Sequence, residues 1–369
     1  MIYRDYKGQK VSVLGMGCMR LPTQKDVEGT PIDYNAAEEI IDYAIANGIT
    51  YFDTAYVYHG KKSEDFLGDA LVDRYPRDSF TIATKFNINA TEDYKACFEE
   101  QLKKLHTDHI DFYLIHAVMD NSADKYIESG CIQYFEEQKK AGRIKNLGFS
   151  SHASPAVLKK FAELRDWDFA QIQLNYFDWL YGTAKEEYEI LSGKNIPIMV
   201  MESIRGGRLS SLTEETNAML KEREPDMSVS SWALRFLMSL PGIQVILSGM
   251  STLDQIKDNI ATFDKPALND EEVEFVLDVC KKFHQAVAIP CTACRYCTPN
   301  CPMGIEIPVV LALYNKVKIG EGWGIKEEIA KLEAGPADCI GCRACTVECP
   351  QSIQIPDLMS AFAEELEKM

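Results

Sequence analysis

Two cysteine runs near the C-terminal end of the chain have a spacing that suits iron–sulfur chemistry. Each run follows the pattern Cys-x2-Cys-x2-Cys-x3-Cys-Pro, and the cysteines are Cys291, Cys294, Cys297, Cys301, Cys339, Cys342, Cys345 and Cys349. In iron–sulfur proteins with this spacing, three thiolates bind one [4Fe-4S] cube and the fourth thiolate binds the other cube. The pattern therefore predicts two [4Fe-4S] clusters, which transfer single electrons.

The crossed arrangement assigns one ligand of each run to the cluster of the other run. The first cluster would be held by Cys291, Cys294, Cys297 and Cys349, and the second by Cys339, Cys342, Cys345 and Cys301. Paired zinc sites are the alternative, because zinc also takes sets of four thiolates. Two complete runs, each followed by a proline, favour iron–sulfur clusters over zinc.

Four titratable side chains earlier in the chain offer a second kind of chemistry. They stand at or just after short apolar runs, and they are Asp53, Tyr58, Lys85 and His116. A carboxylate, a phenol, an ammonium group and an imidazole could together hold a proton and deliver it to a substrate oxygen. This acid–base chemistry requires that the fold bring the four groups together.

The elements between Ile49 and about Thr262 alternate short apolar strands with amphipathic helices. The expected strands are Val13 to Met19, Thr50 to Asp53, Phe80 to Lys85, Ile110 to His116, Ile144 to Ser150, Ala170 to Leu174, Ile196 to Met201 and Gln244 to Leu247. Such alternation indicates parallel βαβ units, and this number of them over about 250 residues fits a closed (β/α)8 TIM barrel. The strand ends of such a barrel share one face, which would gather the four titratable groups.

An open, doubly wound sheet is the competing fold. It should carry a Gly-x-Gly-x-x-Gly motif after its first strand. Gly15-Met16-Gly17 lacks the third glycine, so the sequence favours the barrel. The polar stretch Tyr3 to Gln9, with Lys7-Gly8 as its turn, is expected to form a hairpin at the barrel bottom.

We expect three segments along the chain. Residues 1–265 form the α/β barrel, and residues 266–289 form a closing helix and a linker. Residues 290–369 form a small, mainly helical domain for the two clusters, with a C-terminal helical tail.

The stretch from about Ser12 to Asn259 resembles the aldo/keto reductase superfamily, and the cysteine region resembles dicluster ferredoxin domains. The first resemblance depends on Asp53-Thr54-Ala55-x-x-Tyr58, followed in order by Lys85 and His116. It implies that Tyr58 is the general acid and that Lys85 lowers its pKa. It also implies that Asp53 holds Lys85 charged and that His116 orients the substrate carbonyl oxygen. Tyr56 is the alternative acid.

The same resemblance implies a nicotinamide cofactor, NADP or NAD, and a small-molecule carbonyl substrate. The residues implied in cofactor binding are Ser150, Ser151, Gln171, Met201, Arg205, Gly206, Gly249, Ser251, Gln255 and Asn259. Ser151 stands where the family has an asparagine. Gly249 and Gln255 stand where NADPH-selective members have basic residues. Tyr56, Trp179 and Tyr181 are expected to line the substrate pocket.

Composition excludes several other classes of protein. The formal net charge of −17 argues against a nucleic-acid-binding protein. No apolar run reaches the length of about 18 residues that a transmembrane helix needs. Met1 to Lys7 shows no apolar secretory core, so we expect a cytoplasmic protein whose clustered cysteines bind metal rather than form disulfides.

The chain combines a predicted hydride-transfer site with predicted single-electron clusters, and this combination is compatible with three functions. Nicotinamide transfers two electrons as hydride, whereas each cube transfers one. In one reading, a carbonyl reductase carries accessory or electron-transfer clusters. In a second, the chain is an iron–sulfur electron-transfer protein or a flavin-assisted reductase with a redox partner protein. In a third, it is a ligand-binding or redox-sensing protein on a retained barrel.

Overall fold

The computed structural model describes residues 1–25, 27, 29, 31–286, 289–318 and 324–369. By its internal contacts the chain divides into two compact units. The first consists of Met1–Ser203 and Ser231–Val273, and the second of Ile204–Ser230 and Glu274–Met369. Residues 287–288 of the expected linker lie outside the described residues.

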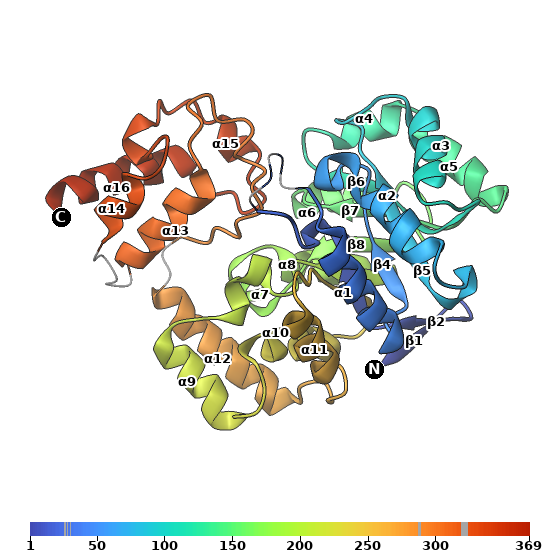
Figure 1. Ribbon diagram of the computed structural model, residues 1–369, viewed down its shortest axis with the longest axis horizontal. Coiled ribbons are helices and arrows are strands. Elements are labelled where there is room, and N and C mark those ends of the chain that lie inside the picture. Colours follow the sequence, from blue (N-terminus) through green and yellow to red (C-terminus); the bar gives the residue numbers. More distant parts are fainter. Residues whose placement is uncertain (26, 28, 30, 287–288, 319–323) are drawn as a thin grey trace. The chain divides into compact units, whose positions relative to one another are not determined.

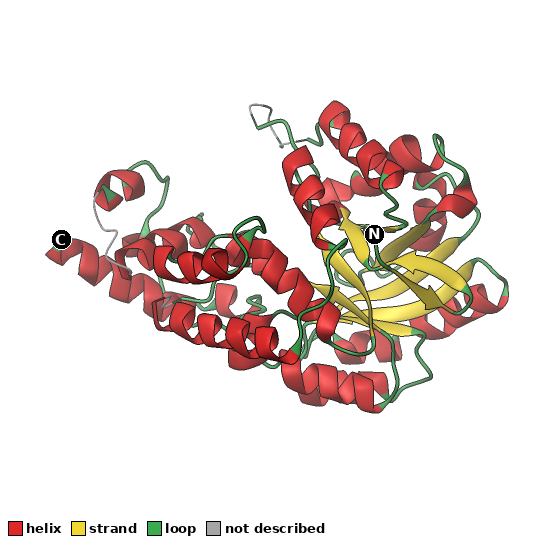
Figure 2. Cartoon of the chain, turned by 90° about the horizontal axis from the view of Figure 1, so that it is seen from below, coloured by secondary structure: helices red, strands yellow, loops and turns green. Residues whose placement is uncertain are grey.

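Within the described residues of the first unit, eight parallel strands close into a barrel. The strands are β3 (Leu14–Gly17), β4 (Tyr51–Asp53), β5 (Thr81–Phe86), β6 (Ile110–Val118), β7 (Ile144–Ser151), β8 (Phe169–Gln173), β9 (Ile198–Met201) and β10 (Ile243–Ser248). Neighbouring strands follow chain order, and β10 closes the barrel by pairing with β3. Figure 2 shows these strands in yellow. The expected TIM-barrel fold is confirmed.

Large side chains fill the inside of the barrel, and two glycines make room for them. Tyr51, Phe112 and Phe169 belong to this interior cluster. A Cβ atom at Gly15 would lie 3.1 Å from the ring of Tyr51 and 2.7 Å from Val245 Cγ1. A Cβ atom at Gly148 would lie 2.6 Å from the ring of Phe169. Any larger residue at either glycine would displace the packed core.

A hairpin of β1 (Tyr3–Tyr6) and β2 (Gln9–Ser12) precedes the barrel, as expected. Lys7 and Gly8 in its turn both have positive φ, 52° and 84°, as a type I′ hairpin turn requires. Tyr6 packs in the same cluster as the barrel-lining rings and lies 5.2 Å from Phe112, centroid to centroid. The hairpin therefore plugs one end of the barrel.

Helices surround the strands of the first unit (Figure 1). They are α1 (Tyr34–Ala46), α2 (Ser63–Leu67), α3 (Tyr94–Lys104), α4 (Ala123–Glu128), α5 (Cys131–Lys140), α6 (Pro155–Ala162), α7 (Tyr176–Tyr181), α8 (Ala184–Gly193), α10 (Val229–Ser239) and α11 (Leu253–Thr262). Side chains cap several of them: Asp33 accepts from Ala36 N before α1, and Asp93 accepts from Ala96 N before α3. Such caps satisfy backbone donors at the first turn and fix where each helix begins.

The second unit is helical in its described residues. Its helices are α9 (Glu214–Arg223), most of α12 (Asp270–Ala286), α13 (Ile307–Lys318), α14 (Ile325–Ile329), α15 (Ala344–Val347) and α16 (Ile355–Lys368). Tyr314 on α13 stacks on Phe362 of α16 at 4.5 Å and 9°. The cysteine-rich region therefore has a core of its own, which includes Cys297 and Cys345.

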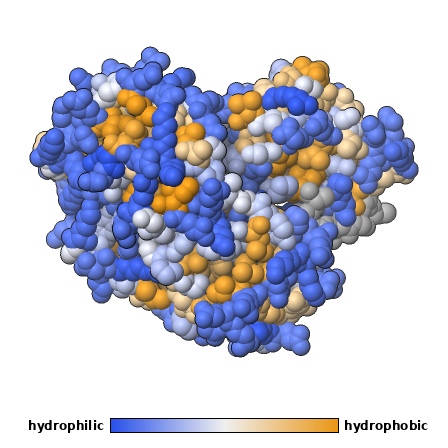
Figure 3. Space-filling view, turned by 180° about the vertical axis from the view of Figure 1, so that it is seen from behind, coloured by the Kyte–Doolittle hydropathy of each residue, from blue (hydrophilic) through white to orange (hydrophobic). Residues whose placement is uncertain are grey.

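The face of the molecule shown in Figure 3 is mostly polar. Hydrophilic residues cover most of it, and apolar residues gather in smaller areas. Among the described residues, no helix has the length and apolar character needed to cross a membrane.

Candidate active site and cluster cavities

The barrel strands deliver the four expected acid–base residues to one place. Asp53 is the last residue of β4, Lys85 is the fifth residue of β5, and His116 lies near the end of β6. Tyr58 opens the short helical turn that follows β4. Since parallel strands end on the same side of a barrel, these positions share the face on which barrel enzymes place their active sites.

Lys85 is the centre of the group. Its Nζ lies 2.6 Å from Asp53 Oδ1 and donates to the Thr54 carbonyl oxygen at 2.7 Å. The exposed fractions of the Lys85 and Asp53 side chains are 0% and 4%. Burial lowers the pKa of Lys85 and raises that of Asp53, and the opposite charge of each partner opposes the change in the other. Removing one partner would leave an uncompensated buried charge.

Tyr58 and His116 lie against this ion pair. Lys85 Nζ is 5.0 Å from the centroid of the Tyr58 ring. The rings of Tyr58 and His116 are 5.8 Å apart and nearly perpendicular. By contrast, the hydroxyl of Tyr56, the alternative acid, donates to Glu100 Oε2 at 3.0 Å and accepts from Lys61 Nζ at 3.1 Å.

The pKa of Tyr58 departs from the expectation drawn from the sequence. The pKa of Tyr58 is raised well above its ordinary value, mainly by burial and then by the charge of Asp53. This direction is opposite to the expected lowering of the Tyr58 pKa, because burial is the largest influence on the phenol. The Lys85 nitrogen donates to Asp53 and to the Thr54 carbonyl oxygen. Burial also lowers the pKa of His116 well below its usual value. The site therefore holds a neutral phenol beside a neutral imidazole.

Cys18 is a site neighbour that the sequence does not reveal. It follows β3, is fully buried, and feels the charges of Asp53 and Lys85. Burial raises the pKa of its thiol, so the sulfur is held as a neutral group beside the ion pair.

At the ends of β7, β8 and β9, the expected nicotinamide residues have suitable polar groups. The Gln171 amide nitrogen lies 3.6 Å from the sulfur of Met201, and its Oε1 is buried with no hydrogen-bond partner among the described residues. The hydroxyl oxygens of Ser150 and Ser151 accept from Ala117 N at 2.8 Å and Ala153 N at 3.1 Å. The unmatched Gln171 oxygen fits a ligand amide N–H, which a nicotinamide carboxamide provides.

The expected adenosine-end residues surround the start of α11. Ser251 N donates to Gln255 Oε1 at 2.7 Å, and the Asn259 amide donates to Ser248 Oγ at 2.8 Å. A Cβ atom at Gly249 would lie 3.1 to 3.2 Å from the side-chain carbons of Arg20. Gly249 therefore lets the stem of Arg20 pack against this loop.

Arg20 is a cation that sequence reasoning missed at this end of the site. Ser251 Oγ donates to the Arg20 carbonyl oxygen at 2.6 Å across a separation of 231 residues. Only the closure of the barrel between β10 and β3 brings these positions together, so a local motif could not reveal the contact.

The remaining expected residues lie elsewhere. Arg205 and Gly206 belong to the second unit, where Arg205 is buried and Gly206 has a positive φ of 63°. Trp179 packs on Tyr188 and on Phe236, with ring centroids 5.5 and 5.9 Å apart. Tyr181 is exposed.

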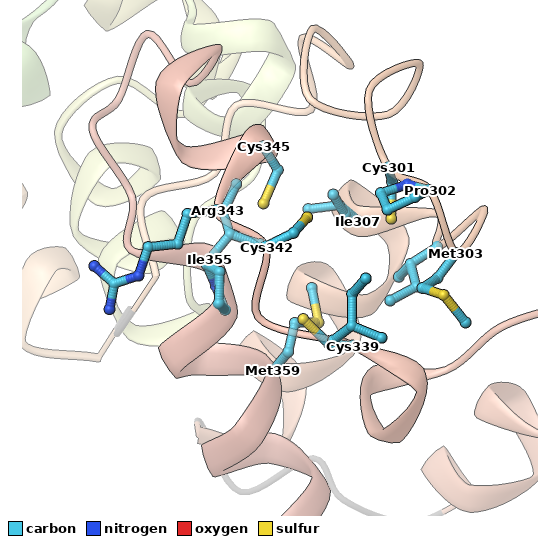
Figure 4. Close-up of a pocket in the computed structure, with 13 residues that line it drawn as sticks. Cys301, Pro302, Met303, Ile307, Cys339, Cys342, Arg343, Cys345, Ile355 and Met359 are labelled. Carbon is cyan, nitrogen blue, oxygen red and sulfur yellow. The ribbon is translucent and has the colours of Figure 1, made fainter.

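The described part of residues 289–369 holds two cavities, each lined by four cysteines. Cys291, Cys294, Cys297 and Cys349 line the first. Cys301, Cys339, Cys342 and Cys345 line the second, which is shown in Figure 4. These are the two crossed sets that the sequence predicts. Four thiols around a largely apolar cavity fit a [4Fe-4S] cube, whose ligands are thiolates.

The fold and the two kinds of site define an α/β-barrel oxidoreductase joined to an iron–sulfur domain. Comparison with known families agrees. The aldo/keto reductase family model matches residues 13–279, and a 4Fe-4S dicluster domain model matches residues 290–354. The chain belongs to the aldo/keto reductase family.

Individual relatives are similar to this chain over about three quarters of its length. The chain is 31% identical over 298 residues to "Uncharacterized oxidoreductase YqkF" of Bacillus subtilis, covering 72% of this chain and 91% of that protein. It is 24% identical to L-galactose dehydrogenase of Arabidopsis thaliana, and the match covers 74% of this chain and 93% of that protein. Among solved structures, the aldo-keto reductase AKR11C1 from Bacillus halodurans in its holo form superposes with a TM-score of 0.63. The two share 26% identity, over 76% of this chain and 96% of that one.

Proposed function

We propose that the protein reduces an aldehyde or ketone with a nicotinamide nucleotide and uses Tyr58 as the general acid. The observation that carries the proposal is the buried Asp53–Lys85 ion pair, with the Lys85 nitrogen 5.0 Å from the centroid of the Tyr58 ring. A pure scaffold has no use for an ion pair buried beside a phenol and an imidazole. Such groups are the means of moving a proton in a site.

Each residue has a defined task in this reaction. A bound nicotinamide would supply hydride to the carbonyl carbon. Tyr58 gives its proton to the carbonyl oxygen as negative charge develops there, and His116 donates a hydrogen bond that orients the same oxygen. The raised pKa of Tyr58 keeps the phenol protonated before the reaction. Lys85 then stabilises the phenolate that remains until solvent returns the proton.

The nucleotide would be held by groups already on the barrel. Gln171 Oε1 and the serines at the end of β7 would bind the carboxamide, and Met201 would pack on the ring. Arg205 and Gly206 are proposed to contact the pyrophosphate. Ser251, Gln255 and Asn259 would surround the adenosine, and the Arg20 side chain against Gly249 supplies a cation for a 2′-phosphate. This placement supports NADPH over NADH.

The cysteines are proposed to bind two [4Fe-4S] clusters in the crossed sets that line the two cavities. Residues 1–265 would carry the carbonyl chemistry, residues 290–369 the clusters, and residues 266–289 would connect them. A redox protein is the proposed partner of the clusters.

Tyr58→Phe tests the assignment of the acid. The phenyl ring preserves packing against His116 but cannot donate a proton, so we expect carbonyl reduction to fall by about 100- to 10,000-fold. The measurement is NADPH oxidation with a panel of aldehydes and ketones under anaerobic conditions, with the cluster absorbance recorded in parallel. Tyr56→Phe is the matched control and should retain activity. Equal turnover in the Tyr58 variant and the parent would remove Tyr58 from its role.

Electron transfer through the clusters is the second candidate function. Cys342 is exposed, and the nearby Ile340 and Val347 have exposed fractions of 63% and 68%. A cluster-binding cysteine that is exposed among apolar side chains suits electron exchange with another protein. Bleaching of the oxidised clusters on addition of NADPH alone would favour this function, and unchanged cluster spectra would favour carbonyl reduction without the clusters.

A further inference from the structure

The two cysteine cavities are built by an internal repeat in the sequence. Both runs read Cys-x2-Cys-Arg-x-Cys-Thr-x2-Cys-Pro-x2-Ile-x-Ile-Pro. The final Ile-Pro of each copy opens a helix, α13 in the first copy and α16 in the second. The residues that line one cavity therefore have counterparts that line the other.

Two polar exceptions break this correspondence. Ile340 and Met303 line the second cavity, whereas their counterparts in the first cavity are Thr292 and Gln351. The second cavity is thus lined by apolar side chains at the places where the first has a hydroxyl and an amide. Two cubes bound in these cavities would meet different surroundings.

The orientation of the Gln351 amide is determined by its partner. Arg205 Nη2 donates to Gln351 Oε1 at 2.8 Å. Because a guanidinium can only donate, the amide oxygen must face Arg205 and the NH2 group must point elsewhere. That nitrogen is buried and has no hydrogen-bond partner among the described residues. An unmatched buried donor is costly unless a bound group accepts from it.

A buried positive charge lies beside the Gln351 amide. Arg205 is 2% exposed, and its Nη2 lies 2.8 Å from Oε1 of Gln351, a residue that lines the first cavity. The guanidinium therefore lies one side chain away from that cavity.

We propose that Gln351, oriented by Arg205, donates an N–H···S hydrogen bond to the first cluster and raises the reduction potential of that cluster alone. Reduction adds one electron and one negative charge to the cube. A donor and a nearby cation stabilise the reduced form more than the oxidised form, which raises the potential. The inference rests on the proposed [4Fe-4S] assignment, but it is independent of the carbonyl reaction.

The test is an anaerobic redox titration of the full-length protein followed by electron paramagnetic resonance. Gln351→Met gives the first cavity the residue of the second. We expect one of the two reduction waves to move to lower potential and the other to stay. The expected change in the oxidised-to-reduced ratio is about tenfold, or about 59 mV for one electron.

Two further variants and a control sharpen the result. Gln351→Glu keeps a partner for Arg205 but removes the donor, and it should move the same wave further down. Arg205→Met should also lower that wave, since it removes the cation and frees the amide. Gln354→Met, at an exposed glutamine three residues away, should move neither wave.

Iron and sulfide analysis separates failure of the inference from failure of the proposed function. A parent protein without iron would refute the cluster assignment itself. With full iron and sulfide content, unmoved waves in both Gln351 variants would overturn the inference. Equal movement of both waves would also overturn it, because the donor would then not act on one cluster alone.

Discussion

At the level of single residues, the active site keeps its charge balanced until a substrate arrives. The Lys85 nitrogen is paired with Asp53, and burial keeps Tyr58 and His116 neutral. Tyr58 is half-buried, and a phenol whose pKa is raised does not lose its proton spontaneously. In the proposed reaction it would release the proton when the carbonyl oxygen becomes basic, and the Lys85 charge would then stabilise the phenolate. Protonation would thereby be coupled to the proposed hydride transfer.

Arg20→Gln tests whether this residue selects the nucleotide. Only NADPH carries a 2′-phosphate, and a charge-assisted hydrogen bond to it is worth about 1.5–3 kcal/mol. We therefore expect kcat/KM for NADPH to fall by about 10- to 100-fold while the value for NADH changes little. Steady-state kinetics with one carbonyl substrate provides the measurement. Arg74→Gln, at a surface arginine paired with Asp42 at 2.8 Å, is the control. Equal losses with both nucleotides would contradict the role.

At the level of elements, a buried polar network supports the strand that carries Lys85. Glu64 on α2 accepts from Thr84 Oγ1 at 2.5 Å and from the Gln101 amide at 2.7 Å. The same amide donates to the Lys85 carbonyl oxygen at 3.1 Å, and Tyr113 donates to Gln101 Oε1 at 2.7 Å. These bonds tie α2, α3, β5 and β6 together behind the site, so the backbone of Lys85 is held from outside the barrel.

Glu64 also makes the stability of the barrel depend on pH. Burial raises its pKa from 4.5 to about 7. Below the unfolded pKa the carboxyl is neutral in both states, so its full contribution is present. That contribution is lost as pH rises from 4.5 through about 7, because the unfolded state ionises more readily. The loss is about 3 kcal/mol at 1.36 kcal/mol per pKa unit.

Glu64→Gln should remove this pH dependence, since glutamine is shaped like the protonated acid and does not ionise. The free energy of unfolding of the variant relative to the parent should rise by about 3 kcal/mol between pH 4.5 and pH 8. Anaerobic urea unfolding followed by fluorescence at several pH values measures it. The exposed Glu189→Gln should stay within about 0.5 kcal/mol of the parent. If the free energy of unfolding of Glu64→Gln differed from that of the parent by the same amount at every pH, Glu64 would not titrate in the folded protein with a raised pKa.

Much of this architecture is predictable from local patterns. The strand expected over Phe80 to Lys85 is found at Thr81–Phe86, and the turn at Lys7-Gly8 is where a positive φ was needed. The cysteine runs predict the two crossed sets that the cavities bring together, because short spacers let three thiols of one run converge and runs of this pattern give the fourth thiol to the other cube. These features depend on neighbours along the chain.

Other features depend on distant contacts or on burial, which the sequence does not display. Arg20 meets the loop at Gly249 only through closure of the barrel. The direction of the pKa change at Tyr58 depends on how far the fold takes the phenol out of water and on the nearby charge of Asp53. The Arg205–Gln351 hydrogen bond joins residues 146 positions apart.

At the level of the whole molecule, the second unit recruits a segment from within the barrel sequence. Residues Ile204–Ser230 follow β9 closely in the chain, yet their contacts group them with Glu274–Met369. Besides the Arg205–Gln351 hydrogen bond, Lys282 pairs with Glu215 at 3.5 Å, and Arg223 lies 4.8 Å from the centroid of the Phe275 ring. The unit is thus assembled from two stretches of chain.

Removal of the clusters should therefore loosen both stretches and spare the barrel. Cys297 and Cys345 belong to the core of the second unit, and metal binding to such thiols contributes directly to folding free energy. After oxidative removal of iron, hydrogen–deuterium exchange should show lost protection in α13 and α16, and partial loss in residues 204–230. Strands β5 and β6 should keep their protection, because their ladders and the barrel core need no metal. Chelator without oxidant, which leaves the clusters in place, is the control. Simultaneous loss of protection in β5, β6 and α13 would show that barrel and cluster region unfold as one cooperative body, and unchanged protection in α13 would show that iron does not hold the second unit together.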